Sequence, residues 1–251
     1  QFKMCKYYDS WEQYKNFYEG TLANYELIST GVDQKLGERA KCENLIPLYE
    51  KGFEQYKTDA VWLQRAAGKM SEKECTDSPL YFKIVNAYHE LSPSANSAYF
   101  LAILKDKEGK VNEAIQFYEQ AISLEQDNFR KAQFYSRIAS KFQARGNYAK
   151  ARTYYRDALR LNPSNLNPHL SIAAMYANSA NDCGDTVFNK RAVYWLAAEE
   201  ARKAGAAGAK HVESYIGRAP SKSDIFTAGN GGQTITIGCW IGSSVKVPVI
   251  Q

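Results

Sequence analysis

The sequence predicts an all-α protein, a solenoid of helical hairpins closed by a short β-hairpin cap. Two observations favour this fold. Alanine and large apolar residues recur at alternating spacings of three and four, which places them on one face of a helix. The same arrangement returns after roughly 34 to 37 residues, a period that indicates stacked repeats and not one globular core.

The composition fits a folded protein and excludes several classes. The chain has 251 residues, of which 45% are hydrophobic and 24% charged, so a disordered chain is excluded. Because the formal charge is +5 and no dense run of Lys and Arg stands out, we expect no nucleic-acid partner. The longest uncharged stretch, residues 225–245, holds five glycines and many polar residues, so we expect no membrane insertion. The start at Gln1 suggests a processed or trimmed chain.

Residues 1–59 are predicted to form a helical segment with a degenerate repeat. We expect helices over residues 6–19 and 35–53, and we also assign the connection to helix. The first of these helices carries Trp11 and two tyrosines on one face.

The clearest repeat spans residues 132–165. Its spacings predict two amphipathic helices, broken at Gly146 and ended by Pro163. Small residues fall where the two helices approach most closely, while aromatic side chains fill the flanks. The alanines expected at this crossing are Ala139, Ala151 and Ala158.

Related copies lie on both sides of this repeat. Residues 95–128 fit the same frame, and residues 60–93 give a more distant copy. A third follows over residues 169–196, with a loop inserted at 178–185. We therefore assign residues 60–204 to the repeat region.

The aromatic, alanine and proline positions of these copies resemble the tetratricopeptide repeat. The pattern departs from that family at Lys105, where Tyr is preferred, and in the inserted loop. The resemblance implies a concave groove, lined by the first helix of each repeat, that holds an extended peptide or a partner's helix. The groove residues implied are Asn96, Tyr99, Ile103, Asp106, Lys107, Gln133, Ser136, Ser140, Gln143, Asn167, Leu170 and Ala174.

Two further comparisons indicate which type of tetratricopeptide protein this sequence resembles. Some members hold a peptide's C-terminal carboxylate with a Lys and an Asn one helical turn apart, but Tyr99 and Ile103 occupy those positions here, which disfavours that subtype. The chain ending, with residues 218–226 and 238–242, looks like tetratricopeptide proteins of the Bacteroidota cell envelope. This likeness implies a role in a bacterial envelope assembly.

Residues 205–251 are expected to cap the solenoid. Residues 207–217 suit a short helix, and residues 234–237 and 245–247 alternate in polarity as a β-hairpin does. An isolated hairpin is marginal in water, so its apolar face must dock, and the nearest uncovered surface is the last helical pair around Leu196. The side chains to be buried are Ile235, Ile237, Val245 and Val247.

The sequence offers few parts for a catalytic site. His89, His169 and His211 lie on predicted helices without partners at metal-ligand or triad spacing. Residues 229–232 lack the lysine and the helix of a phosphate-binding loop, and the inserted loop lacks the ligand spacing of a calcium site. We therefore expect no catalytic activity, no cofactor and no metal ion.

The five cysteines indicate a compartment. None forms a CxxC pair, which excludes a zinc ribbon or a thioredoxin-like motif. Cys42 and Cys75 lie about one repeat apart, while Cys183 lies in the inserted loop and Cys239 in the tail. Two bridges, Cys42–Cys75 and Cys183–Cys239, leave Cys5 free or paired outside the chain and require an oxidising compartment such as the periplasm. The alternative is five free thiols in the cytoplasm.

Binding is the function that the sequence favours. The first hypothesis is a non-catalytic scaffold for protein–protein interaction. A second is a ligand-binding or enzymatic site between the repeats and the tail, suggested by Trp240 among glycines. A third is a structural subunit of a homo-oligomer joined through Trp11. The sequence names neither the partner nor the oligomeric state.

Overall fold

The computed structural model describes residues 41–250, which fall into two compact units. The described residues of the first unit are 41–91, and those of the second are 92–250. The division between Leu91 and Ser92 falls within residues 60–204, the span that the sequence assigns to the repeats. The expected helix over residues 6–19, with Trp11, lies outside the described residues, as does Cys5.

The described residues of the first unit contain three helices, α2 (Cys42–Tyr56), α3 (Ala60–Glu72) and α4 (Pro79–Leu91). The Asp59 side chain caps α3 by accepting from the backbone N–H groups of Val61 and Trp62, which satisfies donors that a helix start leaves unpaired. The α3–α4 pair is the hairpin expected from residue 60 onward. The predicted helix over 35–53 corresponds to α2, which begins at Cys42 within the described residues and ends three residues later than expected.

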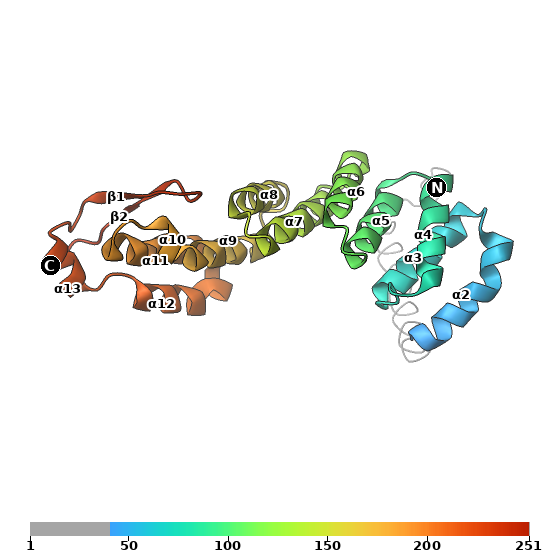
Figure 1. Cartoon of the computed structure of the whole chain (residues 1–251), viewed down its shortest axis with the longest axis horizontal. Coiled ribbons are helices and arrows are strands. Elements are labelled where there is room, and N and C mark those ends of the chain that lie inside the picture. The colour runs from blue at the N-terminus through green and yellow to red at the C-terminus, as the bar shows by residue number, and fades with distance from the viewer. Residues whose placement is uncertain (1–40, 251) are drawn as a thin grey trace, which may run out of the picture. The chain divides into compact units, whose positions relative to one another are not determined.

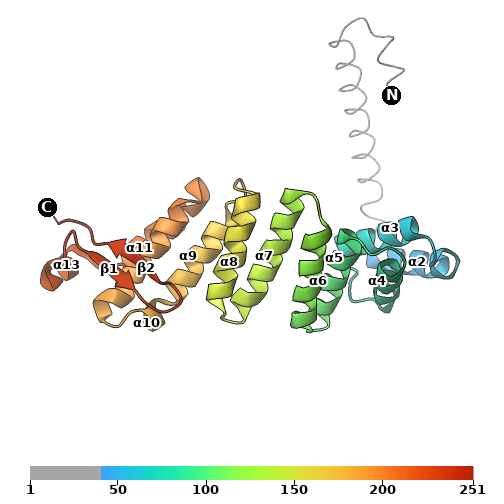
Figure 2. The ribbon, with the colours of Figure 1, turned by 90° about the horizontal axis from the view of Figure 1, so that it is seen from above.

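The second unit stacks helical hairpins in sequence order (Figure 1). The first pair is α5 (Ala95–Lys107) with α6 (Val111–Leu124), and the second is α7 (Asn128–Ala144) with α8 (Tyr148–Leu161). The third pair is α9 (Asn167–Asn178) with α11 (Val187–Arg202), and the inserted loop between them contains the short α10 (Ala180–Cys183). Figure 2 shows these helices side by side.

Glycine turns two of the hairpins. Gly109 and Gly146 both have φ of 73°, a left-handed conformation in which a Cβ atom would be strained. They occupy the same place in successive repeats, between the first and second helix. At the crossing beyond the second turn, the alanines predicted to be buried are buried, with exposed fractions of 0% for Ala139 and Ala151 and 2% for Ala158.

Polar contacts between side chains join the repeat of α5 and α6 to the repeat of α7 and α8. Each joins residues 33 to 35 positions apart, slightly less than the 37-residue offset between the two repeats, and the pairs are Asn96 with Arg130, Asp106 with Lys141, Asn112 with Arg145, and Glu119 with Tyr154. Because a repeat array has contacts only between neighbours, such pairs help to fix the register of one hairpin on the next.

The C-terminal cap consists of short elements on the last hairpin. A 3₁₀ turn (Gly205–Gly208) leads into α12 (Ala209–Arg218), and α13 (Lys222–Ala228) follows, a helix that the sequence pattern did not predict. Strand β1 (Thr234–Ile237) pairs antiparallel with β2 (Ser243–Lys246), with Ile235 opposite Val245. The predicted all-α fold with a C-terminal β-hairpin is confirmed.

The hairpin docks on α11, beside which it lies in Figures 1 and 2. Ile237, Val245 and Val247 are at most 2% exposed and join the core cluster of Leu196, whereas Ile235 is only partly buried. The second strand starts two residues before the expected position. The turn therefore spans residues 238–242, and Cys239 lies in the turn, with φ of 49°, and not on the strand face of Ile237.

Candidate functional site

A cavity of about 330 Å³ opens between the first helices of the two central repeats. Tyr99 comes from α5, Tyr155 from α8 and Asn165 from the loop before α9, while α7 supplies the remaining wall. The lining residues are Tyr99, Gln133, Ser136, Arg137, Ser140, Tyr155 and Asn165. Four of the residues expected in the groove thus meet in one cavity, namely Tyr99, Gln133, Ser136 and Ser140.

Helix periodicity accounts for the α7 wall. Gln133, Ser136 and Ser140 follow one another at spacings of three and four, so they share a face of α7 with Arg137. The helix begins where Asp127 accepts a 2.7 Å hydrogen bond from the Phe129 N–H. On the inner side of α7, Phe134 is buried and stacks on the Tyr99 ring at 5.1 Å between centroids. Packing against Phe134 therefore fixes the Tyr99 ring, which also lines the cavity.

Two polar groups of the cavity lack partners among the described residues. The Ser136 hydroxyl oxygen is buried and accepts or donates no hydrogen bond there, although buried polar atoms are nearly always paired. The exposed Arg137 has no carboxylate within ion-pair distance in the described part of the chain. Arg137 was not among the predicted groove residues. The sequence signal that could have identified Arg137 is its position one residue after Ser136, on the side of the helix that faces the cavity.

The other predicted groove residues lie elsewhere or are already engaged. Asn96 accepts from Arg130, and Asp106 pairs with Lys141. The Gln143 side-chain oxygen accepts a 2.7 Å hydrogen bond from the Tyr155 hydroxyl. Outside the cavity, Ile103 and Leu170 are partly buried, whereas Lys107 and Asn167 are exposed.

Basic residues concentrate in the second central repeat. Residues 128–161 contain nine Lys and Arg against one Asp, although the whole chain has 32 basic and 27 acidic residues. The positive charge is therefore concentrated in this repeat. The lack of any dense run of Lys and Arg had suggested that the charge is dispersed along the chain, and this expectation is wrong. Several of these cations are held by neighbours, including Arg130 by Glu125 and Arg160 by Asp157.

A second cavity of about 540 Å³ lies between α6 and α8, beside Tyr135 of α7. Its polar walls are paired internally. The Tyr154 hydroxyl donates a 2.9 Å hydrogen bond to Glu119, and burial together with this bond raises the pKa of Tyr154 to about 12. Lys150 lies over the Phe142 ring at 5.2 Å. This cavity is larger, but its charges already have partners.

Trp240 is a packing residue. Its indole N–H donates a 2.9 Å hydrogen bond to the Ser179 hydroxyl, and its ring lies 5.4 Å from the rings of both Tyr148 and Tyr176. The Arg152 guanidinium lies 5.1 Å from the ring centroid on a further side. Trp240 is therefore partly buried against residues of α8, α9 and the Ser179 link, and it is not an exposed aromatic platform for a ligand.

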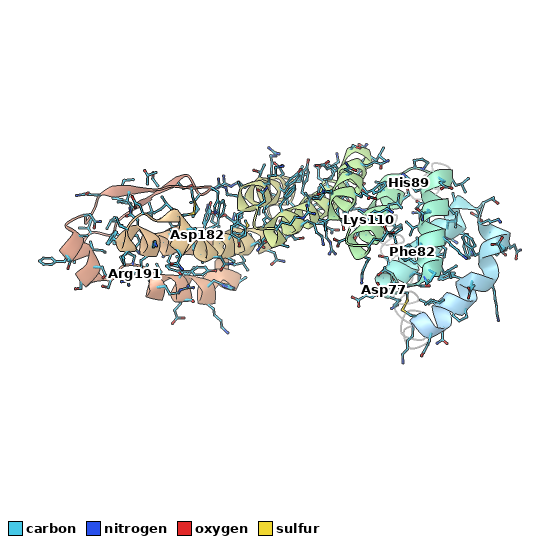
Figure 3. The ribbon with its side chains drawn as sticks, viewed as in Figure 1. Asp77, Phe82, His89, Lys110, Asp182 and Arg191 are labelled. Atoms are coloured by element: carbon cyan, nitrogen blue, oxygen red, sulfur yellow. A yellow bond between two sulfur atoms is a disulfide. The ribbon has the colours of Figure 1, made fainter. Side chains whose placement is uncertain are left out.

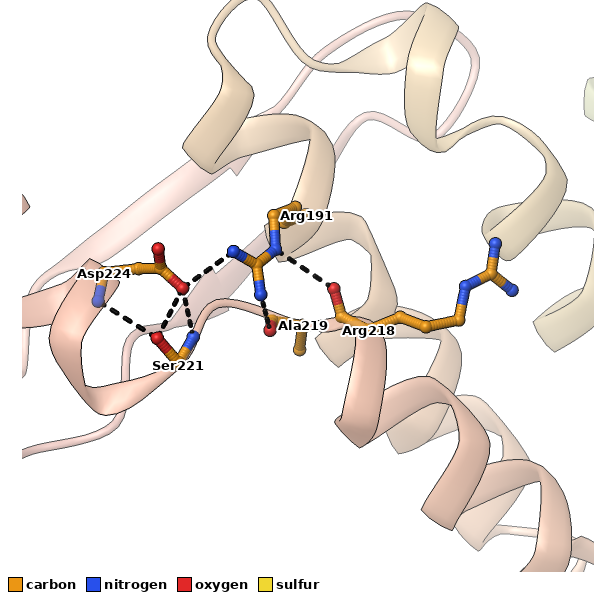
Figure 4. A network of polar contacts seen from close by, with 5 residues as sticks. All are labelled: Arg191, Arg218, Ala219, Ser221 and Asp224. Atoms are coloured by element: carbon orange, nitrogen blue, oxygen red, sulfur yellow. Dashed lines mark hydrogen bonds and ion pairs between the residues drawn. The ribbon is translucent and has the colours of Figure 1, made fainter.

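A polar network fastens α13 to the preceding helices (Figure 4). The Arg191 guanidinium donates 2.8 Å and 3.3 Å hydrogen bonds to the carbonyls of Ala219 and Arg218 and pairs with Asp224 at 2.7 Å. Asp224 and Ser221 form a capping box at the start of α13. The motif at residues 218–224 thus has a structural role in this cap.

The structure brings together both cysteine pairs expected from the sequence. Cys42 and Cys75 are disulfide-bonded with Cα atoms 5.4 Å apart, and Cys183 and Cys239 with Cα atoms 5.2 Å apart. A cavity of about 360 Å³ adjoins the second bridge and includes Asp182, which Figure 3 labels along with Arg191. Within residues 41–250, no group of three or more potential ligands is placed to hold a metal ion.

The histidines take structural positions. His169 lies 2.7 Å from the carboxylate of buried Glu200, which also pairs with Lys203. Burial raises the pKa of Glu200, but the hydrogen bonds from Lys203 and His169 outweigh it, so the pKa lies below its ordinary value. Burial lowers the pKa of His89, and His211 is exposed. Among the described helices, none is long and apolar enough to cross a membrane.

This geometry defines an all-α protein of stacked helical hairpins with a C-terminal cap. Two segments, residues 95–128 and 132–165, match family models of the tetratricopeptide repeat. These residues are thus two tetratricopeptide repeats, which confirms the family that the sequence pattern indicated.

One curated relative and two solved structures are similar to parts of this chain. The photosystem I assembly protein Ycf3 of Cyanophora paradoxa is 33% identical over 96 residues, and the match spans 35% of this chain and 56% of that relative. One crystal structure of MamA has a TM-score of 0.55 at 17% identity and covers 71% of this chain and 95% of its own. Another has a TM-score of 0.53 at 16% identity, with 74% and 93% covered. At these identities the likeness to MamA shows the fold alone.

Proposed function

We propose that the chain is a non-catalytic scaffold that binds an extended segment of a partner protein along the first helices of its repeats. The observation that carries this proposal is the cavity formed by Tyr99, Gln133, Ser136 and Ser140. It combines an aromatic wall with polar side chains, two of whose groups lack partners among residues 41–250. An extended peptide supplies the backbone donors and acceptors that such a surface can pair.

Two further lines support a scaffold within an assembly. The relative Ycf3 is by its name an assembly protein, and repeat arrays offer binding surfaces that suit this task. The two cysteine pairs at disulfide distance favour an oxidising location. We therefore propose an extracytoplasmic scaffold, with a bacterial envelope assembly as the setting that the chain ending suggests.

The experiment selects partners and then blocks the cavity. A displayed library of random peptides of about twelve residues is selected on the full chain, and the dissociation constants of the winners are measured by fluorescence polarisation. Gln133→Trp fills the cavity mouth from an exposed position on α7 and should weaken binding at least about tenfold, because it excludes the peptide from its seat.

The matched control is Gln116→Trp on α6, an exposed glutamine outside the cavity. It should leave the dissociation constants within about twofold, as surface changes away from an interface do. Peptides that bind both variants as tightly as the unaltered chain would show that the partner uses another surface. A selection that yields no binding peptide would remove the support for peptide recognition.

A further inference from the structure

The cavity on α7 presents one cation that nothing in the described chain neutralises. Of the nine basic residues between positions 128 and 161, Arg137 is the one that lines this cavity. The positive charge of Arg137 acts to lower the pKa of the nearby Tyr118 phenol. Burial raises the pKa of Tyr118, so this phenol stays neutral at pH 7 and does not balance the guanidinium.

Two neighbouring cations of α7, Arg130 and Lys141, differ from Arg137 in being paired with carboxylates, and Lys131 does not line the cavity. Arg130 pairs with Glu125 at 3.1 Å, and Lys141 pairs with Asp106. These two ion pairs lie on either side of Arg137 along the helix. The cavity therefore offers a single unpaired positive charge between two neutralised positions, beside the unpartnered Ser136 hydroxyl.

We infer that the groove selects a partner segment with an acidic side chain, whose carboxylate is received by the exposed Arg137 on the wall of the cavity. This inference rests on the proposed function and specifies its partner. A carboxylate accepts hydrogen bonds from a guanidinium in bidentate fashion. One Asp or Glu side chain therefore satisfies the unpaired guanidinium of Arg137.

The charge pattern favours an acidic protein segment over a nucleic acid. A nucleic acid brings a regular row of phosphates and calls for a row of available cations. Here Arg137 is the one Lys or Arg that lines the cavity, and two other cations of the repeat are held, since Arg160 pairs with Asp157 and Arg152 donates to the carbonyls of Trp240 and Ile241. A single cation in a cavity with neutral polar walls matches an isolated carboxylate on a peptide.

The test is a double-mutant cycle on the full chain with peptides selected as above. Each peptide is made with its acidic residue intact and with Glu→Gln, amidated at the C-terminus so that only side chains carry negative charge. Glu→Gln in the peptide and Arg137→Gln in the protein should each weaken binding about five- to tenfold. In the Arg137→Gln variant, the peptide change should have little further effect, because the pair is already broken.

The control is Arg156→Gln, which removes the same charge from an exposed position on α8 outside the cavity. It should leave both dissociation constants within about twofold. Equal weakening by the two arginine variants would show that net charge alone attracts the peptide, and would overturn the inference. So would peptides that bind only with a free C-terminal carboxylate, or tighter binding of a single-stranded oligonucleotide that Arg137→Gln abolishes.

Failure of this inference can be told from failure of the proposed function. If Gln133→Trp blocks peptides that show no preference for Glu over Gln, the groove binds peptides but does not select acidic ones. If Gln133→Trp has no effect, the groove itself is wrong, whatever the peptides' charge.

Discussion

The Arg152 guanidinium on α8 donates a 3.0 Å hydrogen bond to the main-chain carbonyl of Trp240, 88 residues later in the chain. A second bond of 2.7 Å reaches the carbonyl of Ile241, and the guanidinium also lies over the indole ring. Trp240 and Ile241 belong to the turn between β1 and β2, so this one side chain links the second central repeat to the cap. The cap is thus fastened to two repeats, because its strands pack on α11.

Arg152→Ala should destabilise the protein by about 2 to 4 kcal/mol, because it removes charge-assisted hydrogen bonds from a partly buried site. Arg152→Lys should recover only part of this loss, since an ammonium cannot reproduce the planar fork. Urea unfolding measures the loss, and hydrogen exchange over residues 234–247 locates it. The control is Arg156→Ala at the exposed position one turn later, which should cost within about 0.5 kcal/mol. Unchanged exchange in the hairpin would show that Arg152 does not hold it.

Ala151→Leu should destabilise by about 1 to 3 kcal/mol, because Ala151 has no exposed surface and a leucine would overpack the helix crossing. Ala149→Leu on the same helix is the matched control, since Ala149 is exposed. It should change the stability by less than about 0.5 kcal/mol. Thermal unfolding compares the two. Similar effects of both variants would contradict the close approach of the helices at Ala151.

Replacing Glu200 should give a stability loss that depends on pH. The pKa of Glu200 is depressed from its ordinary value of 4.5, so its contribution is fully present above that value and is lost as the pH falls through the lower, folded-state pKa. Glu200→Gln should therefore cost about 1 kcal/mol or more at pH 7 and less as the pH falls below 4.5. Urea titrations across that range measure this. A cost that stays constant with pH would show that the carboxylate's charge is not what stabilises the fold.

Much of this fold could be predicted from the sequence, because the same pattern of packing residues recurs in each repeat. The alanines at the crossing and the glycine turns recur at fixed intervals, so each copy supports the next. The helix α13 escaped prediction because it is short and amphipathic periodicity needs more than two turns to show. Its start is set by the capping box of Ser221 and Asp224 and by the contact of Asp224 with Arg191, a residue 33 positions away.

The candidate site was harder to predict, because tertiary pairing decides which polar residues remain available. Family geometry selected Asn96, Asp106 and Gln143 as groove residues, yet each is engaged by a residue of another helix. Family geometry did not select Arg137. This residue forms no ion pair among the described residues, although Arg130 and Lys141 on the same helix do. Charge counts over short windows also missed the basic repeat, since its cations are spread around two helices.

Removing the bridge between Cys183 and Cys239 should loosen the cap without unfolding the central repeats. The bridge closes a separation of 56 residues, which in the chain-entropy model stabilises by about 3 to 5 kcal/mol. The double variant Cys183→Ser with Cys239→Ser should lose up to that amount, while Arg152 and the buried Ile237, Val245 and Val247 still hold the hairpin in place. Unfolding midpoints give the loss, and hydrogen exchange shows whether it is confined to residues 180–247. Peptide mapping of the unaltered protein without reductant should recover Cys183 linked to Cys239 and Cys42 linked to Cys75. Recovery of Cys239 as a free thiol from oxidised protein would refute the bridge and with it the main support for an extracytoplasmic location.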